Sequence, residues 1–415
     1  MKITIFSGPY PVDEHMGGVG LRLWELAQCL ADGGDHVTIV TPRPSSLAWP
    51  GVTCVTFDSG WRRHVDDADA IVTSDQPDTS VMLHAYRRGV LSVVENAPPI
   101  EHLHYAHLRA SADPQTVYDD LADRYRLQLW LADHLLVRSE PERAATLGAL
   151  VATGRLTWQH HRHDPTLSHL ISLLPIGFNA AADAHAHAAT CAPDAAGTDL
   201  VWNGGVWEYC EPSPMWPALA LLRDQGHPVT MRLLYPPADL TIRATITRAI
   251  GQHGLADLVS IPDAAVPHHQ RDACLLAARA IVCTGRPGPE TQTCHRLRLR
   301  DAWLYRLPVV IDHYGASGDL VTRHRIGAAV DPADSAALAR ALLAAVQDGP
   351  TRSGYLAALE AARPAFTFEA NLHGLRRVLA TGRHAPDVGT PSHQRVVDEL
   401  LARRPELATT PTPIF

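Results

Sequence analysis

The sequence predicts an α/β protein built from two doubly wound parallel sheets. Two observations carry this prediction. Short apolar runs, which suit buried strands, alternate with stretches of helical periodicity along the chain. The alternation also occurs twice, on either side of residues 179–198, which are rich in small and polar residues and have no apolar period. A chain of 415 residues is long enough for two domains of ordinary size.

The first half of the chain supplies the elements of one sheet. Strands are predicted where β-branched and other apolar residues form short uninterrupted runs, as in strands buried on both faces. These runs are residues 3–6, 37–40, 70–72, 90–94 and 135–137. Helices are predicted over residues 20–31 and 115–132, where apolar residues recur every three or four positions.

The second half repeats the alternation without repeating the sequence. Its predicted strands are residues 200–202, 229–234, 258–261, 280–283 and 309–311. Beyond the last of these strands the periodicity is helical. The predicted C-terminal helices are residues 335–348, 353–363, 368–379 and 394–403.

These elements divide the chain into five parts. An N-terminal domain over residues 1–180 is joined by a linker, residues 181–198, to a C-terminal domain over residues 199–365. Residues 366–382 hold one further helix. We expect residues 383–415 to be a loosely held tail, because prolines recur along them and interrupt regular structure.

Composition excludes some classes of protein. A formal net charge of -8 argues against binding to a nucleic-acid backbone. The seven cysteines form no Cys-x-x-Cys pair, and an odd, scattered set is typical of a reducing cytoplasm. The chain has no run of 18 apolar residues, and its first residues predict a strand rather than a signal peptide. We therefore expect a cytoplasmic protein without an integral membrane segment. Lys2 is the only lysine, which is typical of a GC-rich, for example actinobacterial, genome.

The segment over residues 284–310 has the features of a nucleotide-sugar site. A Gly- and Pro-rich loop leads into a helix-like run and then into an apolar strand. Helix N-termini and arginines both suit a diphosphate, and a carboxylate two turns into the helix can accept hydrogen bonds from a ribose. The predicted donor-binding residues of this segment are Arg286, Glu290, Thr291, Arg296, Arg298 and Asp301.

The same segment resembles the donor site of retaining, two-domain (GT-B) glycosyltransferases of the GT4 type. Asp301 stands seven residues before Pro308, where that family has its second glutamate, and Thr293 stands at the position of the first. The resemblance is closer to a subgroup with the motif Glu-Thr…Arg-x-Arg-x-x-Asp. It implies a GT-B fold, in which two Rossmann-like domains face each other across a cleft, a nucleotide-sugar donor, and a last helix that returns to the first domain.

Residues 202–212 resemble a second motif of this subgroup, Trp-x-Gly-Gly-x-Trp-x-x-x-(Asp/Glu)-Pro. Gly204 and Gly205 permit a ligand to approach the backbone closely, and Trp207 offers a stacking face. Many GT4 enzymes neutralise the diphosphate with an arginine and a lysine from this loop. The loop has neither here, so the arginines of residues 286–298 would carry that charge.

Gly17 and Gly18 precede the first predicted helix. A dinucleotide-binding glycine motif should follow the first strand directly, whereas residues 9–15 intervene here. This spacing disfavours an NAD-binding protein. The resemblance instead implies that Gly17 and Gly18 lie against the donor phosphates.

The acceptor is expected on the first domain. Strand C-termini of open α/β sheets face the ligand crevice, and Glu95 ends the predicted strand 90–94. Glu101 fits a further subgroup motif, Asp-x-x-x-Pro-x-x-x-Glu. We take Glu95, Glu101 and Arg296 as candidate catalytic residues. The candidate acceptor-binding residues are Asp13, Glu14, His15, Asp75, Asn96 and His102.

Two patterns that could suggest a metal are assigned structural roles instead. Asp67 and Asp69 have the spacing used by metal-dependent transferases, but they lead directly into a buried strand. The histidines of residues 158–164 lack a second ligand pair, so we expect a polar surface loop. No metal or cofactor is predicted.

The sequence thus predicts a metal-independent, retaining glycosyltransferase. It would use a UDP- or GDP-linked sugar and a small-molecule acceptor, for example in natural-product or antibiotic biosynthesis, and would be a monomer or homodimer. Two alternatives stay open. One is a nucleotide-sugar epimerase of the same architecture, and the other is a non-catalytic donor-binding partner subunit.

Overall fold

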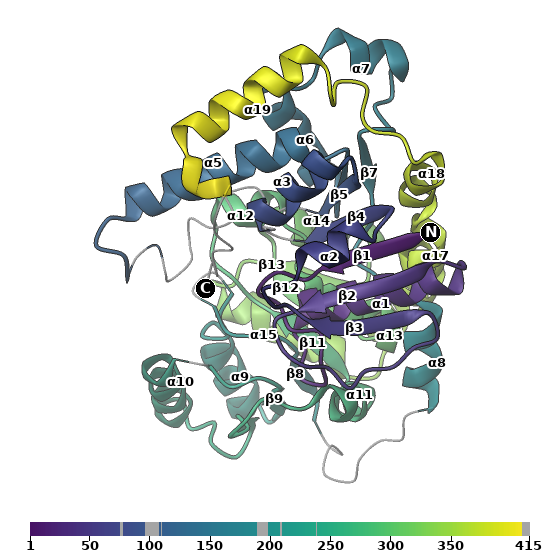
Figure 1. Cartoon of the computed structure of the whole chain (residues 1–415). Helices are drawn as coiled ribbons and strands as arrows, with labels where there is room; N and C mark the ends of the chain where they lie inside the picture. The colour runs from purple at the N-terminus through teal and green to yellow at the C-terminus, as the bar shows by residue number, and fades with distance from the viewer. Residues whose placement is uncertain are drawn as a thin grey trace. The chain divides into compact units, whose positions relative to one another are not determined.

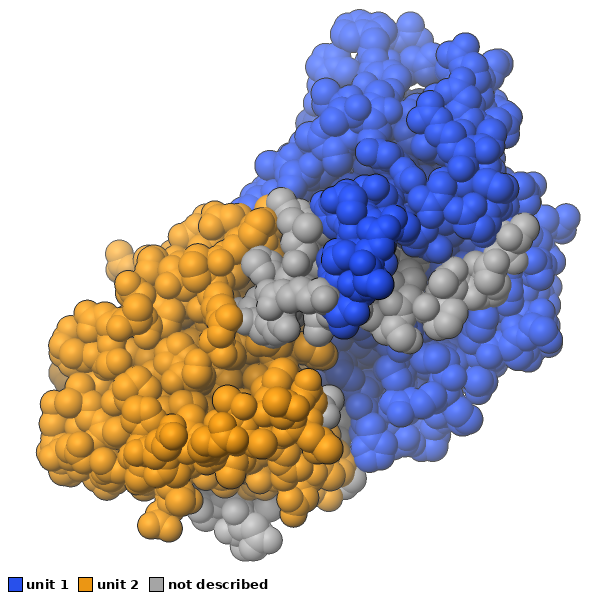
Figure 2. Space-filling view, turned by 90° about the vertical axis from the view of Figure 1, so that its left-hand side faces the viewer, with its two compact units in different colours: residues 1–175, 368–415 blue, residues 176–367 orange. Residues whose placement is uncertain are grey.

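The computed structural model describes residues 1–74, 78–95, 108, 110–188, 198–207, 210–237 and 239–408. The chain forms two compact units (Figures 1 and 2). Unit 1 comprises Met1–Pro175 and Phe368–Phe415, and unit 2 comprises Ile176–Thr367. Unit 1 is therefore discontinuous in sequence, and unit 2 is inserted within it.

Unit 1 contains a seven-stranded parallel sheet with the order β3-β2-β1-β4-β5-β6-β7. Its strands are β1 (Lys2–Phe6), β2 (His36–Thr41), β3 (Val52–Thr56), β4 (Ala70–Ser74), β5 (Leu91–Glu95), β6 (His134–Val137) and β7 (Ile171–Leu173). The five predicted strands are confirmed. The prediction missed β3, which is only partly buried, and β7, which has three residues. The order reverses between β1 and β4, as in doubly wound Rossmann-like folds.

Helices lie between these strands in the sequence. They are α1 (Gly18–Asp32), α2 (Arg62–Asp66), α3 (Thr79–Arg88), α5 (Pro114–Leu131), α6 (Glu140–Ala152) and α7 (Trp158–His163). The predicted helices 20–31 and 115–132 are confirmed as α1 and α5. Local sequence signals fix several ends: the side chains of Asp78, Asp113 and Ser139 accept from backbone N–H groups at the starts of α3, α5 and α6.

The C-terminal segment is not loosely held over its described part, so that prediction was wrong. It forms α17 (Phe368–Asn371), α18 (His373–Thr381), α19 (Pro391–Arg403) and the 3₁₀ helix η5 (Pro405–Ala408). Phe368, Leu372 and Leu375 join the apolar core around α1. Helix α19 packs against α5, and η5 against α3 (Figure 1). Pro391 and Pro405 are the first residues of α19 and η5, where a missing N–H costs nothing.

Unit 2 contains a six-stranded parallel sheet with the order β10-β9-β8-β11-β12-β13. Its strands are β8 (Leu200–Trp202), β9 (Met231–Leu233), β10 (Val259–Ser260), β11 (Ala280–Cys283), β12 (Val309–Asp312) and β13 (Gly327–Val330). All five predicted strands are confirmed. The sixth, β13, consists of small residues, and a side chain at Gly327 would overlap the backbone of Val309 on β12.

The helices of unit 2 enclose one apolar core. They are α8 (Ala180–Ala188), α9 (Met215–Asp224), α10 (Leu240–Gln252), α11 (His268–Ala277), α12 (Pro289–Thr293), η3 (Leu297–Leu299), α13 (Arg300–Tyr305), α14 (Gly315–His324), α15 (Ser335–Val346), α16 (Pro350–Ala362) and η4 (Arg363–Phe366). The largest fully buried side chains of the unit include Trp202, Trp216 and Trp303. Trp303 stacks on Phe366 at 3.8 Å between ring centroids.

Part of the predicted linker is a helix instead. Residues 180–188 form α8, whose start is capped by Asn179: the Asn179 side chain accepts from Ala182 N at 2.8 Å. Asp183 pairs with Arg363, and Ala186 is buried in the core of unit 2. These contacts fix the helix, although its sequence has no apolar period. Residues 189–197 lie outside the described residues.

Among the helices that the structure describes, none combines the length and the apolar character needed to cross a membrane.

Candidate functional site

The candidate site of unit 2 lies where the loops after β8 and β11 meet. These two strands are neighbours in the sheet, so their carboxyl ends lie side by side. Glu211 N donates to Thr284 O at 3.1 Å, and Thr284 Oγ1 donates to Glu211 O at 2.7 Å. The Gly204–Gly205 loop and the arginine-rich segment are thereby brought together, although about 80 residues of sequence separate them.

The arginine-rich segment is not one helix, so that prediction was wrong. Helix α12 ends at Thr293. Cys294 and Arg296 then have extended backbone angles, and the chain continues into η3 and α13. Ser317 on α14 explains the break. Its hydroxyl accepts from Arg296 N at 3.0 Å and donates to Cys294 O at 3.1 Å, replacing bonds that a continuous helix would make.

Gly315 allows α14 to approach α12 closely. Its φ is +57°, which only glycine adopts without strain, and a Cβ there would overlap the carbonyl of Thr291. Thr291 itself is buried and caps α12 by donating to Gly288 O at 2.7 Å. Gly315 is a functional candidate that sequence analysis missed, because a lone glycine after a strand predicts only a turn.

Arg296 is buried and points back to the ends of β11 and β12. Its Nη1 donates to Asp312 at 2.5 Å and to Cys283 O at 3.1 Å. Burial favours the neutral guanidine, but the charges of Cys283 and Asp312 outweigh it and raise the pKa of Arg296 well above its usual value. Within the described structure Nη2 of Arg296 has no hydrogen-bond partner. Arg296 is therefore a fixed cation whose Nη2 group makes no hydrogen bond within the described structure.

Arg298 lies over the glycine loop. Its guanidinium stacks on the ring of Trp202, 4.9 Å from the ring centroid, and its Nη2 donates to Gly205 O at 2.9 Å. A Cβ at Gly204 would lie 2.7 Å from the Cζ of Arg298. Gly204 thus makes room for an arginine of this chain, whereas a Cβ at Gly205 would lie 2.9 Å from the indole nitrogen of Trp207. Arg296 and Arg298 have different partners, and both lie at the meeting point of β8 and β11.

Asp301 is fully buried, which conflicts with its predicted contact to a ribose. Its Oδ2 accepts from Asn203 Nδ2 at 2.6 Å and from Arg271, and its Oδ1 accepts from Arg300 at 2.9 Å. In the described conformation these protein donors occupy the carboxylate. Asp301 therefore acts first as an anchor, since Asn203 immediately precedes the glycine loop. Sequence analysis did not single out Arg271, whose charge on an ordinary helix gives no signal of its burial.

The other predicted donor residues differ in exposure. Trp207 has 56% of its surface exposed, so its ring face is accessible. Arg286 is also exposed, at 61% of its side chain, and pairs with Glu211 at 2.8 Å. Glu290, in contrast, is buried at the start of α12. The structure therefore brings Arg296, Arg298, Gly204 and Gly205 into one place, with Arg286 and Trp207 at its exposed margin.

In unit 1, Gly17 is the N-cap residue of helix α1, and Gly18 is the first residue of the helix. Both are exposed, and a Cβ at Gly17 would meet nothing within 4 Å. The first turn of α1 has no capping side chain. The glycine required by packing is Gly20, where a Cβ would overlap the carbonyl of Pro11. The structure of unit 1 thus gives no internal reason for glycine at position 17.

The predicted acceptor residues of unit 1 fall into two groups. Asp13 is buried, accepts from His15 N at 2.8 Å and pairs with Arg43 at 3.2 Å, whereas Glu14 and His15 reach the surface. The remaining acceptor and catalytic candidates of unit 1, apart from Glu95, lie outside the described residues. They are Asp75, Asn96, Glu101 and His102.

Glu95 is held as a structural anion, which conflicts with its predicted catalytic role. Both of its carboxylate oxygens accept from Arg22 Nε, at 2.7 and 3.0 Å, and the pair is buried. Arg22 also donates to Leu174 O at 2.6 Å and Pro175 O at 2.9 Å. Glu95 therefore ties β5 to α1 and, through Arg22, to the end of the first segment of unit 1.

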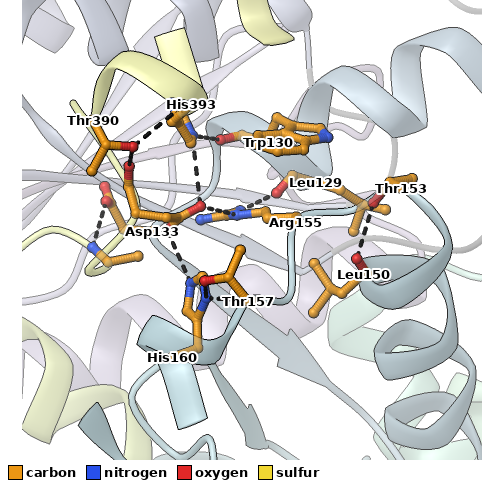
Figure 3. A network of polar contacts seen from close by, with 12 residues as sticks. Leu129, Trp130, Asp133, Leu150, Thr153, Arg155, Thr157, His160, Thr390 and His393 are labelled. Carbon is orange, nitrogen blue, oxygen red and sulfur yellow. Dashed lines mark hydrogen bonds and ion pairs between the residues drawn. The ribbon is translucent and has the colours of Figure 1, made fainter. Parts of the chain in front are cut away.

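The histidine run is not a surface loop either. It forms α7, and His160 is fully buried, with Nδ1 facing Thr157 (Figure 3). Nε2 of His160 lies 3.0 Å from Asp387. Asp387 also pairs with the fully buried Arg155 at 3.2 Å, and His393 faces Trp130 O at 2.7 Å. This network attaches the C-terminal segment to α5 and α7. Within the described residues no group of three or more ligand-type side chains is arranged for a metal.

No family model and no curated protein sequence matches this chain. Solved structures do. Sucrose-phosphate synthase from Thermosynechococcus elongatus matches with a TM-score of 0.63 and 17% identity, over 92% of this chain and 100% of that chain. HepE from Anabaena in complex with UDP-glucose matches with a TM-score of 0.60 and 16% identity, over 92% and 100%.

A third match is α,α-trehalose 6-phosphate synthase from Burkholderia multivorans, with a TM-score of 0.59 and 15% identity over 92% of this chain and 99% of that chain. At these identities the likeness concerns the fold. The structure contains two parallel sheets with doubly wound strand orders. The matches cover 92% of this chain and nearly all of each matched chain, so both sheets lie within the matched part. This chain has the two-domain, Rossmann-like GT-B fold.

Proposed function

We propose that the chain is a retaining glycosyltransferase that moves a sugar from a nucleotide-sugar donor to a small-molecule acceptor. The observation that carries the proposal is the meeting of Arg296 and Arg298 at the carboxyl ends of β8 and β11. This is the part of an open α/β sheet where ligands bind. One structure of the same fold is named a glycosyltransferase and another is a complex with UDP-glucose, which supports a nucleotide-sugar donor.

The chemistry proposed for the site is electrostatic. As the sugar leaves, negative charge develops on the diphosphate, and fixed cations stabilise it without having to reorganise. Arg296 is held by Asp312 and Cys283, and Arg298 by Trp202 and Gly205, so both are fixed in this sense. Arg286, which is exposed and pairs with Glu211, is the third proposed phosphate contact.

Retention of configuration requires no strong protein base in this scheme. The leaving phosphate oxygen can take the acceptor proton as it departs, so that the protein contributes charge stabilisation and alignment. Glu95, which is paired with Arg22, is therefore not needed as a base in this scheme. Asp13, Glu14 and His15 stay the proposed acceptor-binding residues of unit 1, and Gly17 and Gly18 stay proposed donor contacts.

Binding measurements test the donor site. Calorimetry with UDP, GDP, ADP and dTDP identifies the base. Arg298→Ala should then weaken the preferred nucleoside diphosphate about 10- to 100-fold, the effect of about 1.5–3 kcal/mol for a hydrogen bond to a charged group. Arg323→Ala, an exposed arginine of α14, is the matched control and should change nothing. Equal affinities of the two variants would show that Arg298 is not a phosphate ligand.

Turnover measurements separate the alternatives. A glycosyltransferase releases nucleoside diphosphate faster when acceptor is added. An epimerase changes the sugar without an acceptor, and a donor-binding subunit binds without turnover. Because arginines supply the positive charge in this proposal, activity should survive EDTA. Loss of activity on chelation that Mn²⁺ or Mg²⁺ restores would contradict the metal-independent mechanism.

A further inference from the structure

Two buried cysteines face each other beneath the candidate donor site. Cys210, in the loop after β8, and Cys283, the last residue of β11, have their sulfur atoms 3.6 Å apart. Both are free thiols, and both are buried. The backbone holds them there, since Glu211 and Thr284, the next residues along the chain, are joined by two hydrogen bonds.

The surroundings of the two thiols differ. Cys283 Sγ accepts from Arg296 Nη1 at 3.4 Å. Burial opposes ionisation of Cys283, but the hydrogen bond from Cys210 and the charges of Arg296 and Arg298 outweigh it and lower the pKa of Cys283. The hydrogen bond to Cys283, followed by burial, raises the pKa of Cys210. One sulfur is thus suited to attack as a thiolate, and the other to follow as a thiol.

We propose that Cys210 and Cys283 form a reversible disulfide, a modification site that regulates the donor site. The reaction consumes one hydroperoxide. The Cys283 thiolate attacks the peroxide oxygen, which gives a sulfenic acid and, after protonation, water or an alcohol. The Cys210 sulfur then displaces hydroxide from the sulfenic acid, and the two thiol protons leave as part of the water formed. Two electrons pass from the thiols to the peroxide.

The geometry limits both the movement and the oxidant. A disulfide bond is about 2.0 Å long, so the two sulfurs must approach by roughly 1.5 Å. Side-chain rotation and small loop shifts allow a change of this size. Because both thiols are buried, the oxidant must be small. Hydrogen peroxide should react, whereas a bulky disulfide such as oxidised glutathione should not.

Oxidation would change the charge next to Arg296. The sulfur of Cys283 faces this guanidinium, and disulfide formation removes the negative charge that its thiolate form places there, leaving Asp312. The donor site becomes more positive. This part of the inference rests on the proposed function, and it predicts that the oxidised protein binds nucleoside diphosphate tighter, by on the order of tenfold.

Peptide mapping tests the disulfide itself. Reduced protein is treated with hydrogen peroxide, denatured, alkylated and digested. Alkylatable thiols should fall from seven to five, with a linked peptide pair containing Cys210 and Cys283 that dithiothreitol separates. Cys274→Ser, which removes another buried thiol of unit 2, should still form the link, and Cys210→Ser should not. Peroxide-treated wild-type protein that keeps both thiols, or carries Cys283 as sulfinic acid, would overturn the proposal.

Affinity measurements test the regulatory part. The oxidised and reduced proteins are compared by calorimetry with the nucleoside diphosphate that binds best. Unchanged or weaker binding after complete oxidation would overturn the regulatory effect. If no nucleotide binds either form while the disulfide maps as expected, the proposed function fails and the modification site stands. Because the mapping uses wild-type protein, it does not depend on the folding of a variant.

Discussion

Replacing Asp387 with asparagine should detach the C-terminal segment from unit 1. Asp387 is buried and faces Arg155 Nε at 3.2 Å and His160 Nε2 at 3.0 Å. Asparagine has the same shape but no charge. It would leave the fully buried guanidinium of Arg155 without its anion, and Nη2 of Arg155 already has no hydrogen-bond partner in the described structure.

The expected loss of stability is about 3–5 kcal/mol, which is typical of breaking a buried ion pair by removing one partner. The pH dependence follows from the pKa of Asp387. Burial alone would raise it, but the hydrogen bond from His160 and the charge of Arg155 outweigh burial and lower it. A lowered pKa contributes stability above the unfolded value and loses it as pH falls through the folded value. The difference between wild type and variant should therefore be constant from pH 7 to 5 and shrink below about pH 4.

Urea unfolding, combined with hydrogen exchange on α19, measures this difference. Asp398→Asn, which changes an exposed residue of α19, is the control. Its free energy of unfolding should stay within about 0.5 kcal/mol of the wild-type value. A double variant, Arg155→Met with Asp387→Leu, should recover much of the loss, because it leaves no unpaired buried charge. A loss below about 1 kcal/mol in Asp387→Asn would refute the reasoning, since a buried ion pair cannot be broken so cheaply.

Three further predictions concern other parts of the chain. Burial lowers the pKa of His134 from its usual value of 6.5 to about 4. Between these two pH values the unfolded state binds more protons than the folded state, so the free energy of unfolding should fall by about 2 kcal/mol from pH 7.5 to pH 5. His134→Gln should remove this loss in urea titrations at the two pH values, and an unchanged pH dependence would contradict it. Gly315→Ala should destabilise unit 2 and weaken nucleotide binding, because its side chain would overlap α12, whereas Gly17→Ala has open space and should leave thermal stability unchanged. Asp301→Ala should lower the free energy of unfolding by about 3–5 kcal/mol, since it leaves buried arginines unpaired. If Asp301 also contacts the ribose, the binding free energy of the nucleotide, measured on the folded fraction, should weaken by about 1–3 kcal/mol, the effect of a lost charged hydrogen bond. If Asp301→Ala kept both the stability and the nucleotide affinity of wild type, neither the structural role of Asp301 nor its ribose contact would stand.

The sequence predicted the strands better than the site, for physical reasons. A strand buried on both faces, such as β4 or β11, needs an apolar run, and the run is visible in the sequence. Strand β13 was missed because small residues satisfy its close packing on β12. The periodicity around residues 291–301 is helical, but the hydroxyl of Ser317, more than 20 residues away, breaks the helix.

The candidate site was predicted at the level of the segment but not of each side chain. Composition shows that residues 286–298 are rich in arginine, and the structure places them at the ends of the central strands of unit 2. It does not show which charges become buried. Asp301 and Glu95 look like free carboxylates in the sequence, and tertiary partners such as Arg271 and Arg22 are what engage them. Local sequence carries no information about such partners.

The insertion of unit 2 within unit 1 has a consequence for synthesis on the ribosome. Unit 2 is complete once residue 367 has emerged, whereas unit 1 still lacks Phe368 and the helices that follow. At translation rates of about 5–20 residues per second, the first 175 residues wait roughly 10–40 s for their missing part. During that time the apolar surface of α1 that later receives Phe368, Leu372 and Leu375 is uncovered. The nascent first segment is therefore the form of this protein most exposed to aggregation and most in need of a chaperone.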